Sequence, residues 1–365
     1  MLSQETLKEA LKKNKLKSET YGELEYLRFT DDFKDVPRGT VLLKDTVIWG
    51  YPHIGRIFQI STGIKEQFKG PFWVEEKVDG YNVRIFMHKG EVYALTRGGY
   101  ICAFTTDRTK DFVNLEVFEE HPELILCMEV AGPENPYVEE TPPYLGKDIA
   151  FFLFDIMQKN QQGFLPYREK LKIIERFNLP SVERYGLYIP DGMEELKELM
   201  RKLNQEGREG VVLKEDSERD KRVKYITSYA NLSDIRITSL NMLGLPPDYY
   251  TNRLLRLALF IEEEGLSKDE ELYRELGRAF LDGLFEACRK AREEGKVYRT
   301  FRCRFRSREK ALFFLEQIKH ASVHIQVNML SLEKGDDFWI LEFEKVFLNM
   351  TGLLGHLLGG GSIID

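Results

Sequence analysis

Residues 75–84 read Glu-Glu-Lys-Val-Asp-Gly-Tyr-Asn-Val-Arg, and this stretch decides how the rest of the chain is interpreted. The apolar run Phe-Trp-Val precedes it, and alternating apolar residues follow it. This pattern predicts a strand, a tight turn at Asp79 and Gly80, and then a second strand. We therefore expect Lys77 at the end of a strand, beside a turn, with its amine facing a cleft.

A lysine amine is nucleophilic only when it is unprotonated, and its ordinary pKa of about 10.4 keeps it charged at neutral pH. Burial or neighbouring cations lower the pKa of an amine, so a catalytic Lys77 should have other basic residues near it in space. The alternative is that Lys-x-Asp-Gly is a hairpin turn flanked by charges. The tetrapeptide alone does not separate the two interpretations.

The composition predicts a soluble globular protein of two or three domains, because 42% of the 365 residues are hydrophobic. No apolar run approaches the roughly 18 residues of a membrane helix and no N-terminal secretion pattern is present, so we expect a cytoplasmic protein with no membrane partner. The four scattered cysteines lack a Cys-x-x-Cys pair and predict reduced thiols, without a zinc site. Interleaved charges, 31% of the residues, are compatible with a thermophilic source.

The net charge of −7 argues against a protein that holds nucleic acid by bulk positive charge, although it permits a local basic groove. No phosphate-binding Gly-x-x-x-x-Gly-Lys-Ser/Thr loop and no Gly-x-Gly-x-x-Gly motif is present. A bound nucleotide would therefore not be held in either of these common ways.

Hydrophobic periodicity predicts an α+β protein rather than a doubly wound nucleotide-binding fold. Residues 1–19 are expected to be helical, and 40–49 and 56–61 to be strands. The central region is expected to alternate strands with two helices, the strands at 72–78, 82–88, 92–97, 124–130, 149–156, 210–214 and 221–226 and the helices at 167–177 and 193–205. Arg56 could reach a phosphate, with a solvated charge as the alternative.

The last third of the chain is predicted to be helical first and mixed afterwards. Apolar residues step by four along 272–284 within a helical region at 247–294, and this face is either intramolecular core or a partner surface. Residues 300–345 predict a strand, a helix, a strand and a hairpin, and the tail from 353 is expected to be partly disordered. The arginine row at 302–306 could follow a phosphate backbone, with a solvated sheet face as the favoured alternative.

Several further segments carry residue types that suit one reaction. An arginine beside a flexible turn can grip a phosphate or a ribose hydroxyl, a carboxylate in an apolar strand needs a partner, and an aromatic ring can stack on a base. Each also has an ordinary interpretation as a turn, a core residue or a solvated strand end. The candidates are Arg97, Glu129 and Phe154, followed by the charged residues Glu209, Lys214 and Lys224 at the ends of short strands.

Taken in order, Glu-Lys-Val-Asp-Gly, Thr-Arg-Gly-Gly, Glu-Val-Ala-Gly, Phe-Phe-Leu-Phe-Asp-Ile, Glu-Gly-Val-Val-Leu-Lys and Arg-Val-Lys-Tyr resemble nucleotidyltransferase motifs I, Ia, III, IIIa, IV and V. The resemblance covers residues 72–226 and is to the superfamily of polynucleotide ligases and mRNA capping enzymes. Within it, the chain most resembles the homodimeric ATP-dependent RNA ligases of archaea and some thermophilic bacteria. This implies an N-terminal module at 1–65, a ligase-type (ATP-grasp-like) catalytic domain of antiparallel sheets with flanking helices at 66–240, a helical dimerisation domain at 241–298 and a C-terminal α+β domain at 299–365.

The resemblance also implies roles for individual residues. Lys77 would attack the α-phosphate of ATP, forming a lysyl–AMP intermediate and expelling pyrophosphate, and AMP would then pass to an RNA 5′-phosphate before a 3′-hydroxyl displaces it. Cations around Lys77 would lower the pKa of its amine. The other implied roles are Glu75 near the adenine amine, Asn82 at the variable motif I position, Arg97 on the ribose or an RNA phosphate, Glu129 on the ribose hydroxyl, Phe154 stacked on adenine, Glu209 on Mg²⁺ or Mn²⁺, and Lys224 with Lys214 on the α-phosphate.

Two departures from the superfamily pattern matter. Helices replace the OB-fold and motif VI that follow motif V in DNA ligases and capping enzymes, which favours the RNA ligase group with single-stranded RNA as substrate. Arg222 occupies a position where many ligases have lysine, so its role is open. The alternatives are a DNA ligase or GTP-dependent capping enzyme, and a non-enzymatic RNA-binding dimer that retains the fold. Tolerance of single-stranded DNA is also open.

Overall fold

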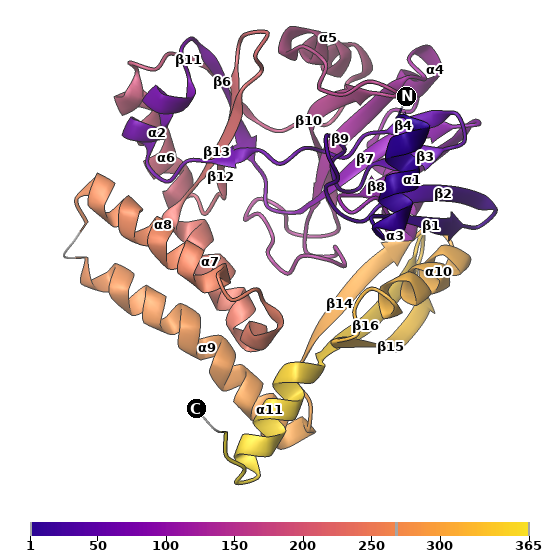
Figure 1. Cartoon of the computed structure of the whole chain (residues 1–365). Helices are drawn as coiled ribbons and strands as arrows, with labels where there is room; N and C mark the ends of the chain where they lie inside the picture. Colours follow the sequence, from indigo (N-terminus) through magenta and orange to yellow (C-terminus); the bar gives the residue numbers. More distant parts are fainter. Residues whose placement is uncertain (1, 267–268, 364–365) are drawn as a thin grey trace. The chain divides into compact units, whose positions relative to one another are not determined.

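The computed structural model describes residues 2–266 and 269–363 and confirms an α+β fold built mainly from antiparallel sheets (Figure 1). The described residues form two compact units, each assembled from separate stretches of chain. The first unit comprises residues 2–54, 80–131 and 149–183, and the second comprises 55–79, 132–148 and 184–363. Among the described helices, none combines the length and the apolar character that crossing a bilayer requires.

The first unit contains two four-stranded sheets. Their strand orders are β1-β2-β3-β4 and β10-β9-β7-β8, and neighbouring strands in both sheets pair antiparallel. Three helices beyond the N-terminal one accompany the second sheet in sequence. The elements are α1 (Gln4–Lys12), β1 (Leu16–Tyr21), β2 (Leu24–Phe29), β3 (Val41–Leu43), β4 (Thr46–Ile48), β7 (Tyr81–His88), β8 (Glu91–Thr96), α3 (Ala103–Phe112), α4 (Glu116–Glu120), β9 (Leu124–Ala131), β10 (Ala150–Gln158) and α5 (Tyr167–Phe177).

The second unit contains a five-stranded sheet, a helical region and a three-stranded sheet. The strand orders are β11-β6-β12-β13-β5 and β14-β16-β15. The elements are β5 (Gly55–Arg56), α2 (Ile60–Gln67), β6 (Phe72–Lys77), β11 (Arg184–Tyr188), α6 (Met193–Gln205), β12 (Gly210–Glu215), β13 (Arg222–Ile226), α7 (Ser228–Thr238), the 3₁₀ helix η1 (Ser239–Gly244), α8 (Tyr249–Glu264), α9 (Glu270–Glu294), β14 (Tyr298–Phe305), α10 (Arg308–Lys319), β15 (Ile325–Lys334), β16 (Trp339–Phe347) and α11 (Leu348–Leu358).

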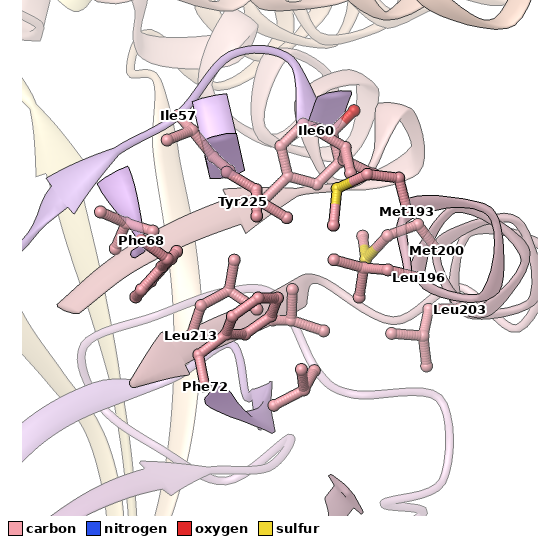
Figure 2. Close-up of a cluster of buried hydrophobic side chains, with 14 residues drawn as sticks. Ile57, Ile60, Phe68, Phe72, Met193, Leu196, Met200, Leu203, Leu213 and Tyr225 are labelled. Atoms are coloured by element: carbon pink, nitrogen blue, oxygen red, sulfur yellow. The ribbon is translucent and has the colours of Figure 1, made fainter. Parts of the chain in front are cut away.

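The five-stranded sheet buries one face against helices α2 and α6. Figure 2 shows this core, in which Phe72 of β6 and Leu213 of β12 lie with Met193 and Met200 of α6. Successive strand residues point to opposite faces, so Phe72 and Val74 enter the core while Trp73 between them points the other way. The core therefore fixes which face of β6 carries Lys77.

The helical region packs through small residues. On α9 the fully or nearly buried positions are Ala279, Gly283 and Ala287, which repeat every four residues. A Cβ atom on Gly283 would lie 2.1 Å from Ser239 Oγ of η1, so only glycine permits this close approach. The larger residues of the same helix, Leu281 and Phe285, are exposed.

Strong hydrophobic patterns were predicted accurately. All seven central strands are present with ends within two residues of the expected ones, and the helices at 167–177 and 193–205 match α5 and α6. The region 247–294 forms α8 and α9, apart from residues 267–268, which lie outside the described residues. The C-terminal region has one strand fewer than expected, because β14 and α10 are followed only by the hairpin β15–β16.

Three N-terminal predictions are wrong. The helix expected over 1–19 ends at Lys12, because Asn14 adopts a left-handed conformation (φ 55°) and Leu16 begins β1. The strand expected over 40–49 is a hairpin, since residues 44–45 form its turn. The strand expected over 56–61 ends at Arg56, because Ile60 and Ile64 are buried one helical turn apart at the start of α2.

The number of helices in the central region was predicted too low. The central region has α3, α4 and α7 as well as the two expected helices; α3 and α7 bury polar residues such as Thr105 and Asn231, so they show no apolar stripe. The tail from 353, which was expected to be partly disordered, is helical in α11 up to Leu358, and its last two residues lie outside the described residues.

Candidate active site

The five-stranded sheet of the second unit gathers charge on the face opposite its hydrophobic core. Residues directly opposite one another in neighbouring strands share a face, as do residues two apart along one strand. Cross-strand pairing therefore brings separate motifs together. The rows on this face are Trp73, Lys214 and Arg222, then Glu75, Val212, Lys224 and Arg56, then Lys77 with Gly210.

Lys77 lies at the end of β6, as predicted, and its amine meets a carboxylate. Lys77 Nζ lies 2.5 Å from Glu209 Oε1, and both side chains are mostly buried. The pairing of Lys77 with Gly210 explains this contact, because Glu209 is the residue just before Gly210. A Cβ on Gly210 would lie 2.2 Å from the Tyr225 carbonyl oxygen, so glycine is required at this position, where φ is +154°.

Burial raises the pKa of Glu209 to about 8, although the nearby Lys77 ammonium opposes the rise. Glu209 Oε2 is buried and has no hydrogen-bond partner within residues 2–266 and 269–363. A carboxyl group with such a pKa can take up a proton near neutral pH. The ionised form of Glu209 is therefore placed to accept the proton that a nucleophilic lysine must lose.

Two neighbouring predicted residues form a buried ion pair. Lys214 Nζ lies 2.6 Å from Glu75 Oε2, and each side chain is 2% exposed or less. Arg222 lies opposite Lys214 in the next strand and pairs with Asp220 at 2.8 Å. The charge of Lys214 is thus balanced by Glu75, while Lys224 lies one row closer to Lys77.

A small cleft lies beside Lys77. On one side Glu76 accepts a hydrogen bond from the Tyr144 hydroxyl at 3.0 Å and pairs with Arg208 at 3.1 Å. The Arg208 guanidinium also lies over the Tyr144 ring, 4.9 Å from its centroid. The lining residues are Glu76, Lys77, Val78, Asp79, residues 140–144, residues 207–209, Tyr229 and Ala230.

Three carboxylates form a cluster beside this cleft. Ligand oxygens of Asp79, Glu140 and Asp234 lie within 4.8 Å of one another. Burial, reinforced by nearby Asp234 and Glu209, raises the pKa of Glu140 to about 7, and burial also raises that of Asp234, which is held by Arg253 at 2.7 Å. Oxygen ligands with partly buried negative charge suit a hard divalent cation such as Mg²⁺.

In the first unit, three neighbouring strands place polar and aromatic residues in one cross-strand row. Asn82 of β7 lies opposite Glu129 of β9, and Glu129 lies opposite Phe152 of β10. Asn82 Oδ1 is buried and has no hydrogen-bond partner among the described residues. Phe154, the predicted stacking residue, falls in a β-bulge, and its ring meets Tyr51 edge-on at 5.3 Å.

Arg97 directly follows the last residue of β8, at the position along the sheet where Asn82 lies in the neighbouring strand β7. Thr96, just before Arg97, lies opposite Val83, which follows Asn82. A Cβ on Gly39 would lie 2.1 Å from the Arg97 carbonyl oxygen, and Gly39 has a φ of +80°, so glycine allows the two loops to meet. Arg97 is exposed, and its Nη2 lies 3.2 Å from His53 Nδ1.

Comparison with known proteins identifies the family. A family model described as RNA ligase matches residues 70–226, and one described as the C-terminal region of the ligase Pab1020 matches residues 237–361. The protein MJ0414 of Methanocaldococcus jannaschii, which is named as uncharacterised, is 34% identical over 348 residues, or 92% of this chain and 87% of its own. The chain belongs to the RNA ligase family.

Solved structures match this RNA ligase over nearly its whole length. A structure named "Putative ATP-dependent DNA ligase from Aquifex aeolicus" is 60% identical, covers 99% of this chain and 100% of its own, and has a TM-score of 0.97. A structure named as an archaeal ATP-dependent RNA ligase is 30% identical, covers 98% and 96%, and has a TM-score of 0.90. The expected family and fold are thus confirmed, and the chain is an enzyme.

The predicted site residues of the RNA ligase fall into two groups. The second unit brings Glu75, Lys77, Glu209, Lys214 and Lys224 together on one face or at its edge. The first unit aligns the other predicted residues, namely Asn82, Arg97, Glu129 and Phe154, around one end of a sheet.

Sequence reasoning missed the acidic cluster, the Glu76–Arg208–Tyr144 contact and Phe152. The neighbouring residues Glu75 and Glu76 did carry one signal, because two adjacent carboxylates at the end of an apolar strand need buried partners. Glu140, Tyr144 and Asp234 lie in segments without a recognisable motif, so their convergence was visible only in the fold.

Proposed function

We propose that this RNA ligase joins RNA 5′-phosphate and 3′-hydroxyl ends with ATP, through an enzyme–AMP intermediate on Lys77. The observation that carries the proposal is the position of the Lys77 amine. It lies beside a small cleft, 2.5 Å from a carboxyl group able to take its proton, and on the sheet face that carries Lys224 and Arg56. The archaeal ATP-dependent RNA ligase that it resembles over 98% of the chain supports the choice of ATP.

In the first step the Lys77 nitrogen attacks the α-phosphorus of ATP. A P–N bond forms, the bond from that phosphorus to the bridging oxygen breaks, pyrophosphate leaves and Glu209 takes the proton from nitrogen. An RNA 5′-phosphate oxygen then attacks the same phosphorus, so the P–N bond breaks and the amine regains its proton. Finally the 3′-hydroxyl attacks the RNA 5′-phosphorus, a phosphodiester forms, AMP leaves and the hydroxyl proton passes to solvent.

The cations on the sheet face would stabilise charge that develops on the phosphates. Lys224 and Arg56 lie in one row, two residues along the strands from the Lys77 row, and are the side chains proposed to face the α-phosphate. Lys214 is paired with Glu75, so its charge would act on the phosphates through the electrostatic field and not by direct contact. Arg222 would act in the same way as Lys214, because it is paired with Asp220.

A divalent cation, Mg²⁺ or Mn²⁺, is the proposed cofactor. Asp79, Glu140 and Asp234 would hold it, with Glu209 near enough to the cluster for their charges to raise its pKa. The raised pKa values of Glu140, Asp234 and Glu209 fit this role, because crowded carboxylates become more stable when a cation balances them. The bound ion would supply charge neutralisation at the phosphate oxygens.

In the first unit the row centred on Glu129 is proposed to recognise the nucleoside. Glu129 would accept a ribose hydroxyl, and Arg97 would contact the ribose or an RNA phosphate. The buried Oδ1 of Asn82 offers an acceptor for a substrate or water donor. Phe154 is the stacking residue implied by the motif, and Phe152 is the alternative because it lies directly opposite Glu129.

The central experiment is covalent labelling. Incubation with α-labelled ATP and Mg²⁺ should label the wild-type protein, and Lys77→Ala should abolish the label. Lys202→Ala changes an exposed lysine on α6 and should keep it. A retained label in K77A would disprove the assignment of the nucleophile. Labelling from GTP in place of ATP would indicate a capping enzyme, and joining of nicked DNA but not single-stranded RNA would indicate a DNA ligase.

A homodimer is proposed from an exposed apolar stripe on α9. Tyr273, Leu281 and Phe285 lie on one helical face at 45%, 50% and 67% exposure, and Leu255 of α8 is 51% exposed. Sedimentation at micromolar concentration should give the mass of two chains, and Phe285→Glu should give that of one. Lys202→Glu, at an exposed position on α6 outside this stripe, is the control. A monomeric wild type would rule out this interface.

Three further assignments complete the proposal. We place the enzyme in the cytoplasm, which is supported by the absence of disulfides among its four cysteines.

The division at 65, 240 and 298 into four domains is proposed from the motif order, and limited proteolysis at these positions would test it. Single-stranded RNA is the proposed acceptor, with single-stranded DNA as the competing substrate in the joining assay.

A further inference from the structure

The arginine row of β14 keeps partial exposure to solvent, and two of its members also pair with a buried acid. Arg304 Nε and Nη2 donate to the two carboxylate oxygens of Glu134 at 2.6 and 2.9 Å. Arg302 Nη1 donates to the same carboxylate at 2.5 Å. Glu134 is only 7% exposed, so two guanidinium groups enclose one buried acid. Such charge-assisted bidentate contacts fix geometry as well as charge.

Glu134 belongs to a segment that contacts β14, an edge strand of its sheet. The Asn135 side chain makes four hydrogen bonds to the backbone of this segment and so holds it in one conformation. Beyond it, the Pro136 carbonyl accepts a hydrogen bond from Lys345 at 2.6 Å, and the Tyr137 ring meets Phe314 edge-on at 6.0 Å. Glu139 pairs with Arg299 at 2.8 Å.

The same segment then reaches the cleft beside Lys77. Glu140 follows Glu139 directly and contributes its carboxylate to the cluster with Asp79 and Asp234. Four residues later Tyr144 donates its hydroxyl to Glu76, the neighbour of Lys77 in β6. Glu140 lies only six positions after Glu134, so the position of Glu140 depends on how the start of the segment is anchored.

We propose that Arg302 and Arg304 are positioning residues for adenylation of Lys77. By holding Glu134 they fix the segment 134–144, and the segment in turn places Glu140 and Tyr144 at the cleft. This inference rests on the proposed function. Through this segment the three-stranded sheet would affect the reaction of Lys77, which lies on another sheet. The effect can be large, because displacing a group by about 1 Å at a phosphoryl-transfer site costs up to about a hundredfold in rate.

The test reverses the charges of this contact. Arg304→Glu and Glu134→Arg each leave like charges facing one another, whereas the double variant R304E/E134R again has one carboxylate between two guanidinium groups. Arg306→Glu is the matched control, because Arg306 follows the same strand and lies over Phe338 instead. Glu134→Gln keeps the shape of the side chain and serves if a charge reversal prevents folding.

Two quantities are measured for each variant. The first is hydrogen exchange of the backbone amides of residues 134–144 in protein free of metal and ATP, which reports anchoring without activity. The second is the single-turnover rate of Lys77 labelling at saturating ATP. R304E, E134R and E134Q should speed exchange in this segment and slow labelling about tenfold or more. The double variant should return both values to near those of wild type, and R306E should change neither.

The outcomes separate this inference from the proposed function. Wild-type protein that is not labelled by ATP would refute the proposed function and the inference with it. Labelled wild type together with R304E and E134Q at the wild-type rate would refute the inference alone. Slowed labelling without faster exchange in 134–144, or without recovery in the double variant, would also overturn it, since the effect would then not pass through this segment.

Discussion

Replacing Glu209 with glutamine should stabilise the protein at high pH while it impairs adenylation. Burial raises the pKa of Glu209 from its ordinary value of 4.5 to about 8. The folded protein therefore binds more protons than the unfolded chain between these two pH values, and the free energy of unfolding falls as pH rises through this window. At about 1.36 kcal/mol for each pH unit, the largest loss is about 5 kcal/mol. Glutamine is a neutral isostere and removes this loss.

The assay is urea unfolding between pH 5 and pH 8.5, without metal or ATP, followed by tryptophan fluorescence. At pH 5 Glu209→Gln should unfold at nearly the wild-type urea concentration, because both side chains are then neutral. At pH 8.5 it should be more stable by several kcal/mol. Glu218→Gln, at an exposed position, is the control and should follow the wild type. Parallel wild-type and E209Q curves across this range would refute the reasoning that buried charge dominates at Glu209.

Three other predictions follow from single contacts. Lys214→Met leaves Glu75 buried without its partner and should cost about 3–5 kcal/mol in urea unfolding, whereas adding Glu75→Leu should recover most of it; an additive double variant would contradict this. Gly210→Ala forces a Cβ to within 2.2 Å of a carbonyl oxygen and should destabilise by more than about 2 kcal/mol, while Gly70→Ala, with open space around it, should be nearly neutral. Asp234→Asn removes one proposed ligand and should raise the Mg²⁺ concentration for half-maximal labelling about tenfold, and an unchanged requirement would exclude it as a ligand.

Local patterns predicted those parts of the fold that local physics controls. Pro166 and the left-handed Asn178 bound α5, and its apolar stripe alternates with charge, so both ends were correct. The helices α3 and α7 were missed because their buried positions include the polar residues Thr105 and Asn231. Periodicity records hydrophobicity, so it is silent where polar groups form the core.

Some features of the candidate site were likewise predicted from local sequence, and others were not. The motif order placed Lys77, Glu209 and Lys224 in one reaction, and the strand register explains why they share a sheet face. The role expected for Phe154 came from the motif that contains it, whereas in the structure Phe154 falls in a β-bulge before Asp155 and Phe152 lies opposite Glu129. One extra residue in a strand reverses which side chains share a face, and no local signal announced it.

The sequence by itself was enough to predict the chemistry proposed for this protein, because the proposed nucleophile and its charged companions occur in short motifs whose spacing suits strand ends and turns. Only the tertiary structure decided which carboxylates meet beside Lys77 and how the arginines of β14 are used. Asp79, Glu140 and Asp234 are up to 155 positions apart in the chain, yet their oxygens lie within 4.8 Å. Such contacts depend on packing between distant segments, and a linear pattern carries no record of that packing.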